Sequence, residues 1–107
     1  MSAEFIVSFE DKNWYATHLE ALTQKITRLG TFSASFEENE FRLIGTEPRS
    51  PGDWSYDVRL FLEKERIFVE ISAHPKSIER DLSVLFEWIR SCTRIAIKDE
   101  DGESSGW

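Results

Sequence analysis

Two histidines and one cysteine are the residues of this sequence best suited to nucleophilic or acid–base catalysis. His18 lies within a helical pattern, His74 lies before a second helical pattern, and Cys92 lies near that pattern's end. A catalytic cysteine or serine needs a histidine and an orienting carboxylate, and no Gly-x-Ser-x-Gly or family cysteine motif is present. We interpret His18 as a partly exposed helix residue, His74 as able to cap a helix, and Cys92 as a small core residue. No catalytic residue is predicted, and we do not expect an enzyme.

An acidic segment near the end of the sequence carries the oxygen ligands that calcium prefers. It reads Asp99-Glu100-Asp101-Gly102-Glu103. A calcium loop of the EF-hand type has glycine at position six and glutamate at position twelve, whereas here glycine is fourth and no twelfth residue follows. The histidines lack a partner four residues away, and a single cysteine excludes Cys-x-x-Cys. We expect an acidic turn without metal or cofactor; a weak divalent site is the alternative.

Carboxylates gather in two clusters of the sequence. The clusters consist of Glu37, Glu38 and Glu40 in the first, and Asp99, Glu100, Asp101 and Glu103 in the second. Trp54 lies in a Pro/Gly-rich loop and Trp107 at the last position, and aromatic side chains beside charges are typical of interface anchors. These nine residues are the predicted partner-binding residues. The alternatives are that the carboxylates are solvated turn residues and that either tryptophan folds back over the core.

The elements that must position these residues follow from hydrophobic periodicity. Alternation predicts six strands, near residues 5–9, 32–36, 41–44, 56–63, 67–72 and 94–98. Apolar residues at helical spacing predict two helices, one holding Tyr15, Leu19, Leu22, Ile26 and Leu29, the other Ile78, Leu82, Leu85 and Ile89. The order is β-α-β-β-β-β-α-β. Because most strands are apolar on one face only, we expect an α+β fold with one mainly antiparallel sheet and both helices on one face.

The connections between these elements are also predicted. Residues 37–40 form a turn in which Asn39 can take a positive φ, residues 45–53 form a loop, and Lys64-Glu65 joins two strands as a hairpin. We expect a single domain over residues 1–107, because this length supports one core and not two. Its tail, residues 99–107, is acidic and then Gly/Ser-containing.

The composition restricts the classes of partner. Of 107 residues, 20 are acidic and 13 are Lys or Arg, for a formal charge of −7. Nucleic-acid binding and docking on an anionic membrane both depend on basic residues, so neither is expected. The charge permits a basic protein partner, although it could also serve solubility alone. No apolar run approaches the roughly 18 residues of a membrane span and no targeting segment is evident, so a cytoplasmic location is expected.

The small size, the acidity, the α+β pattern and the ending from Ile95 to Glu103 together resemble the small bacterial immunity proteins of polymorphic toxin and contact-dependent growth inhibition systems. In particular, the last strand running into an Asp/Glu-Gly-Glu turn is similar to the close of several such proteins. The resemblance implies a cytoplasmic protein that binds a cognate toxin domain, often a basic nuclease, and covers its active site or substrate cleft. It carries over no individual contact residue.

Two other classes of function stay open at this point. A DNA-mimic inhibitor of the anti-restriction or anti-CRISPR type would share the acidity, and a small-ligand-binding α+β domain would need an apolar pocket between helices and sheet. Oligomeric state is a separate question. An exposed edge strand allows two copies to pair, so a homodimer is compatible with the predicted sheet.

Overall fold

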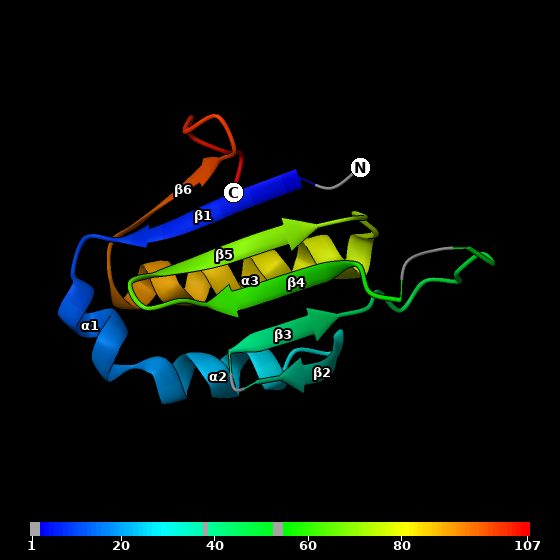
Figure 1. The fold of residues 1–107 in the computed structure, drawn as a ribbon, viewed down its shortest axis with the longest axis horizontal. Coiled ribbons are helices and arrows are strands. Elements are labelled where there is room, and N and C mark those ends of the chain that lie inside the picture. The colour runs from blue at the N-terminus through cyan, green and yellow to red at the C-terminus, as the bar shows by residue number, and fades with distance from the viewer. Residues whose placement is uncertain (1–2, 38, 53–54) are drawn as a thin grey trace.

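A computed structural model describes residues 3–37, 39–52 and 55–107 and shows one six-stranded sheet. The strand order is β2-β3-β4-β5-β1-β6, and every neighbouring pair is antiparallel (Figure 1). The α+β class and the mainly antiparallel sheet are therefore confirmed. The strands are β1 (Ala3–Phe9), β2 (Phe32–Phe36), β3 (Glu40–Leu43), β4 (Val58–Leu62), β5 (Arg66–Ile71) and β6 (Ile95–Asp99).

The described residues form three helices, where the sequence predicted two. They are α1 (Lys12–Thr17), α2 (Leu19–Thr27) and α3 (Lys76–Cys92). Helices α2 and α3 lie behind the sheet on one face, and α1 leads into α2 at the end of the sheet (Figure 1). The opposite face of the sheet carries no helix in this view, so its side chains form a surface.

The extra helix arises because the first predicted helix breaks at His18. The backbone of His18 is not helical, with φ −118° and ψ 19°. The Thr17 hydroxyl donates to the carbonyl of Asn13 at 2.9 Å, and His18 Nδ1 lies 2.7 Å from the carbonyl oxygen of Trp14. Side chains that bond to nearby carbonyls compete with the helical ladder, which favours a break here. The break also leaves Leu19 39% exposed, outside the predicted apolar face.

The core lies between the helices and the inner face of the sheet. All four apolar residues predicted for one face of the second helix are buried on α3. The inner face of the strands contributes alternate residues such as Val7, Leu60 and Val69, each fully buried. Burying a side chain of this kind contributes roughly 1.5–3 kcal/mol. Among the described residues, no helix is both long and apolar enough to cross a membrane.

The start of α3 is capped by a residue that the sequence did not indicate. Pro75, whose side chain has no hydrogen-bonding group, is the N-cap, so the predicted capping by His74 is wrong. Instead the carboxylate of Glu47, from the preceding loop, accepts from the Ser77 backbone N–H at 2.9 Å and from the Ser77 hydroxyl. These bonds lower the pKa of Glu47. A free N–H at a helix start favours such an acceptor, whichever segment supplies it.

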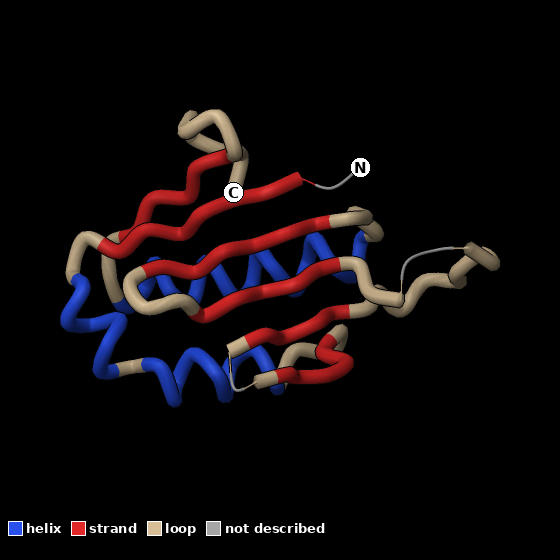
Figure 2. Tube along the Cα trace, viewed as in Figure 1, coloured by secondary structure: helices blue, strands red, loops and turns tan. Residues whose placement is uncertain are grey.

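The connections agree with the predictions except in one turn. Residues 45–52 form a loop that projects beyond the sheet (Figure 2), and buried Asp57 holds its base by accepting from Gly45 N at 2.7 Å and Arg49 at 2.8 Å. The hairpin between β4 and β5 is present, with Glu63 N donating to Arg66 O at 2.9 Å. In the described part of the 37–40 turn, a positive φ of 51° belongs to Glu37, a residue that the sequence did not indicate for this role.

Candidate functional site: the open face of the sheet

One row of side chains crosses the open face of the sheet from edge to edge. The cross-strand register pairs each member with the next, in the order Phe36, Glu40, Phe61, Phe68, Ile6 and Lys98. Residues that lie opposite each other in antiparallel strands share a face. Three aromatic rings and an isoleucine therefore line the side of the sheet that faces away from the helices. Exposed apolar groups on a sheet face are typical of binding surfaces when they gather in this way.

On the half of this face over β2, β3 and β4, charged side chains form ion pairs with other residues of the protein. Arg42 pairs with Glu40 at 2.7 Å, and Arg59 on β4 pairs with Glu70 on β5, also at 2.7 Å. The Arg42 guanidinium also lies over the ring of Phe36, 4.3 Å from its centroid. The charges of Glu40, Arg42 and Arg59, which the structure describes on these strands, therefore already have partners.

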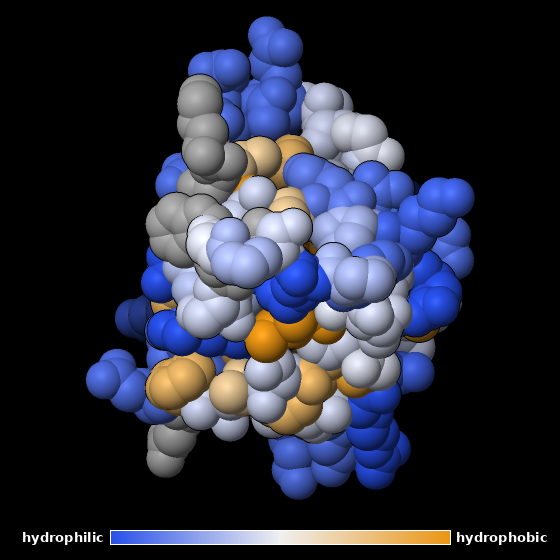
Figure 3. Space-filling view, turned by 90° about the vertical axis from the view of Figure 1, so that its right-hand side faces the viewer, coloured by the Kyte–Doolittle hydropathy of each residue, from blue (hydrophilic) through white to orange (hydrophobic). Residues whose placement is uncertain are grey.

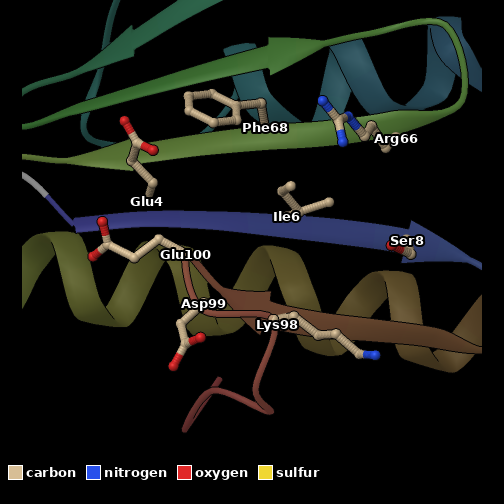
Figure 4. A pocket seen from close by; sticks show the side chains of 9 residues that line it. Glu4, Ile6, Ser8, Arg66, Phe68, Lys98, Asp99 and Glu100 are labelled. Carbon is tan, nitrogen blue, oxygen red and sulfur yellow. The ribbon is translucent and has the colours of Figure 1, made fainter.

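The other half of the face, over β5, β1 and β6, forms a groove of about 350 Å³. Ile6 and Phe68, which lie opposite each other, form its apolar floor. Figure 4 shows that Glu4 and Glu100 lie at one end of the groove, whereas Arg66 and Lys98 lie toward the other end. The two signs of charge are therefore separated along the groove, which has an acidic end and a basic end.

The acidic end of the groove lacks cationic partners within the described residues. Arg66, at the basic end, is held by Glu63 at 2.8 Å. Glu4 forms no ion pair, and neither does Glu100. In the sheet, Glu4 lies directly opposite Glu70, a second carboxylate. Like charges placed opposite each other destabilise a sheet, and the pairing of Glu70 with Arg59 at 2.7 Å offsets part of this repulsion.

The loop after β6 forms the wall beside this acidic end. Asp99 Oδ1 accepts from the backbone N–H groups of Asp101 at 2.9 Å and Glu103 at 3.0 Å, and Gly102 takes a positive φ of 79°. Asp99 thus shapes the turn, while Glu100, Asp101 and Glu103 are exposed. In the described residues, no group of three or more His, Cys, Asp or Glu side chains is arranged to hold a metal ion.

The structure does not bring the two predicted acidic clusters together. Glu37 and Glu40 belong to the turn and strand at the β2 side of the sheet, whereas residues 99–103 follow β6 at the opposite edge. Glu40 is already paired with Arg42, and Glu37 is exposed. Glu38 lies outside the described residues. The 99–103 cluster and Glu4 therefore form the candidate site, and Glu37 and Glu40 lie remote from it.

Of the two tryptophans predicted as interface anchors, the structure describes Trp107. Trp107 folds back onto the core side of α3, where its ring contacts Phe86 edge-on at 5.7 Å and its carbonyl accepts from Arg90. Trp54 lies outside the described residues. Trp107 therefore fastens the C-terminal segment to the domain and acts on the site only through that segment.

The residues first considered for catalysis are dispersed. Cys92 is exposed at the end of α3, so its interpretation as a core residue is wrong, because the helix turns that position away from the sheet. His18 is partly buried and stacks on Trp14, with 4.3 Å between ring centroids. His74 lies 4.0 Å from the carboxylate of Glu79. Each histidine therefore contacts a residue of a neighbouring helix, and neither histidine lines the groove.

Sequence reasoning missed Glu4, Ile6 and Phe68 as site residues. Ile6 and Phe68 could have been found from the alternation of their strands. Each is an apolar residue at a position where the alternation places a solvent-facing side chain. Seen from the end where the 45–52 loop projects, the apolar surface forms small islands among hydrophilic residues (Figure 3). Comparisons with protein families, curated proteins and solved structures give no match to this chain.

Proposed function

We propose that this protein binds a basic protein through the groove over β5, β1 and β6 and inhibits it by covering its working surface. One observation carries the proposal: Glu4 and Glu100 present uncompensated carboxylates at one end of a groove whose floor is Ile6 and Phe68. An arginine or lysine of the partner fits this arrangement, because its aliphatic stem can lie on the floor while its cation meets the carboxylates.

The position of Glu4 supports a binding role. Glu4 faces the carboxylate of Glu70 and forms no ion pair of its own among the described residues, so its presence is easier to explain when a partner's cation neutralises it. Residues that serve binding often lower the stability of the folded protein. Glu100, Asp101 and Glu103 add to the same field, and Asp99 holds their loop in place.

The net charge of −7 supports the choice of a basic partner. Opposed fields steer encounter and raise association rates. A nuclease holds its substrate with basic residues, so an acidic surface that mimics phosphates can occupy such a cleft. Together with the resemblance to immunity proteins, this leads us to propose a toxin domain of the nuclease type as partner and the cytoplasm as the place where the two meet. Glu37 and Glu40 would contribute only long-range attraction.

The experiment that tests this function uses the protein encoded by the neighbouring gene. Its C-terminal domain is produced alone and with this protein, and cell growth and complex formation are measured. The proposal predicts that the domain arrests growth, that co-expression restores it, and that the two purified proteins form a complex that weakens as salt is raised. A toxic domain that is neither bound nor neutralised would contradict the proposed function.

A further inference from the structure

The two edge strands of the sheet, β6 and β2, differ in whether another segment of the chain covers their outer side. Beyond β6, the C-terminal segment turns back and covers part of the strand's outer side (Figure 2). Asp99 N donates to Glu103 O at 2.8 Å, Ser105 N donates to Ile97 O at 3.0 Å, and Lys98 forms a bridge with Ser104. This edge is therefore closed by the protein itself.

The β2 edge has no such cover among the described residues. Phe32 N donates to Leu29 O at 3.0 Å, but no described segment pairs with the outer side of residues 34–36. The sequence of β2, Phe32-Ser33-Ala34-Ser35-Phe36, contains no charged residue and no proline. Natural edge strands usually carry lysine, proline or an irregularity that blocks pairing. Here the irregularity lies between Phe32 and Ala34 and leaves residues 34–36 regular. Phe36 is 42% exposed, an apolar side chain at an open edge.

We propose that a second copy of this chain pairs with β2 in antiparallel fashion, around a two-fold axis at Ser35. Such a pairing forms a two-fold interface, in which each residue of one copy that contacts a residue of the other is contacted in the same way in return. Pairing centred on Ser35 places Phe36 opposite Ala34 of the second copy. Both residues lie on the open face, because they pair with Glu40 and Arg42 of β3, so a large side chain meets a small one.

The irregularity in β2 selects this register over the other symmetric one. Pairing centred on Ala34 would place Phe36 opposite Phe32 of the second copy. Phe32 packs against the core on the inner face, whereas Phe36 lies on the open face, so they cannot share a face of one continuous sheet.

The dimer would join two sheets into one and leave both grooves free. The groove lies over β5, β1 and β6, at the edge remote from β2. Two copies would therefore present two acidic grooves at the outer ends of a continuous sheet, and the assembly would bind two partners. This inference does not depend on the nature of the partner.

The mass of the protein in solution tests the dimer directly. Sedimentation over a wide concentration series should give twice the chain mass of 12.5 kDa. Ser35→Lys places like charges opposite each other at the axis and should return the mass to that of one chain. The matched control is Ala96→Lys, an exposed small residue of the other edge strand, which should stay dimeric. A wild type that is monomeric throughout, or a dimer that survives Ser35→Lys, would overturn the proposal.

A cross-linking experiment tests the register. In a Cys92→Ser background, which removes the exposed thiol, Ser35→Cys should form a disulfide-linked dimer on mild oxidation. Residues opposite each other in antiparallel strands have Cα atoms about 4.5–5.5 Å apart, within the range that a disulfide spans. Ser33→Cys is the control and should cross-link many-fold less. Equal cross-linking of the two variants, or preference for Ser33→Cys, would contradict the Ser35 register.

Discussion

Ile6 of β1 and Phe68 of β5 lie directly opposite each other on the face of the sheet that no helix covers (Figure 4). Their side chains floor a groove in which Glu4 and Glu100 share one end. An apolar floor supplies contact area, and charges without partners orient a binding partner and raise its association rate. The arrangement suits a partner that presents a long cationic side chain.

Replacing Glu4 should raise the stability of the folded protein. Glu4→Gln removes the repulsion between this carboxylate and Glu70, which the Glu70–Arg59 pair offsets in part, so the free energy of unfolding should rise toward the lower end of about 0.2–1 kcal/mol. Urea denaturation at low and high salt measures the change, and the gain should shrink at high salt because screening weakens the repulsion. Glu20→Gln, at an exposed position of α2, is the control. A loss of stability in Glu4→Gln would contradict this account of the residue.

Tyr15 should make stability fall at alkaline pH. Burial, and then the nearby charge of Glu63, raise the pKa of Tyr15 from 10.0 to about 12. Between these values the folded state holds a proton that the unfolded state has lost, so stabilisation present below pH 10 is lost as the pH rises to 12, on the order of 2 kcal/mol.

Tyr15→Phe provides the comparison for this alkaline loss. At neutral pH the variant should be less stable by about 1 kcal/mol, because the hydroxyl no longer bonds to the carbonyls of Glu63 and Arg66. Because the wild type loses more stability over this range than the variant lacks at neutral pH, the difference between the two proteins should close and then change sign between pH 10 and 12. Parallel stability curves across that range would show that Tyr15 does not titrate as described.

Asp81 should be a strong determinant of stability. Its buried carboxylate accepts from the backbone N–H of Thr31 at 2.9 Å and from the Thr31 hydroxyl at 2.7 Å, which ties α3 to the start of β2. Asp81→Ala leaves both donors unpaired and should cost about 1–3 kcal/mol in denaturant unfolding. Asp101→Ala, at an exposed position, should stay within about 0.5 kcal/mol of wild type. Equal effects would be inconsistent with this role.

Asp99 should order the acidic loop that forms the wall of the groove. Asp99→Ala removes the acceptor for the amides of Asp101 and Glu103, so hydrogen exchange at both amides should become faster. The cost in unfolding free energy should be about 0.5–1.5 kcal/mol. Glu100→Ala, which removes a neighbouring charge but no such acceptor, should leave the exchange rates unchanged. Unaltered exchange in Asp99→Ala would show that the loop is held by other contacts.

The sequence predicted the class of fold because alternation and helical spacing are local signals. The apolar face of α3 and the β4–β5 hairpin were both found in this way. The break at His18 was not, because Thr17 and His18 compete for carbonyls only once the first turn has formed. The cap supplied by Glu47 was also not predictable, since it joins residues 30 positions apart.

The site was predicted in part for the same reason. The acidic run at residues 99–103 is visible in the sequence, but its neighbours Glu4, Ile6 and Phe68 come from strands that meet only in the sheet. The strand order, with β1 between β5 and β6, brings the two ends of the chain together at one groove. Nothing local in either segment specifies that pairing.

The central claim is that the acidic end of the groove receives a basic partner, and the association rate tests it most directly. The double variant Glu4→Lys with Glu100→Lys is compared with Glu20→Lys with Glu87→Lys, which changes the net charge equally at exposed helix positions. Binding to the proposed partner, the C-terminal domain of the protein encoded by the neighbouring gene, is followed by stopped-flow at low and moderate salt. We predict association slowed at least tenfold in the groove variant, with a weaker salt dependence, and a smaller change in the helix variant. Equal rates for the two variants would contradict the claim.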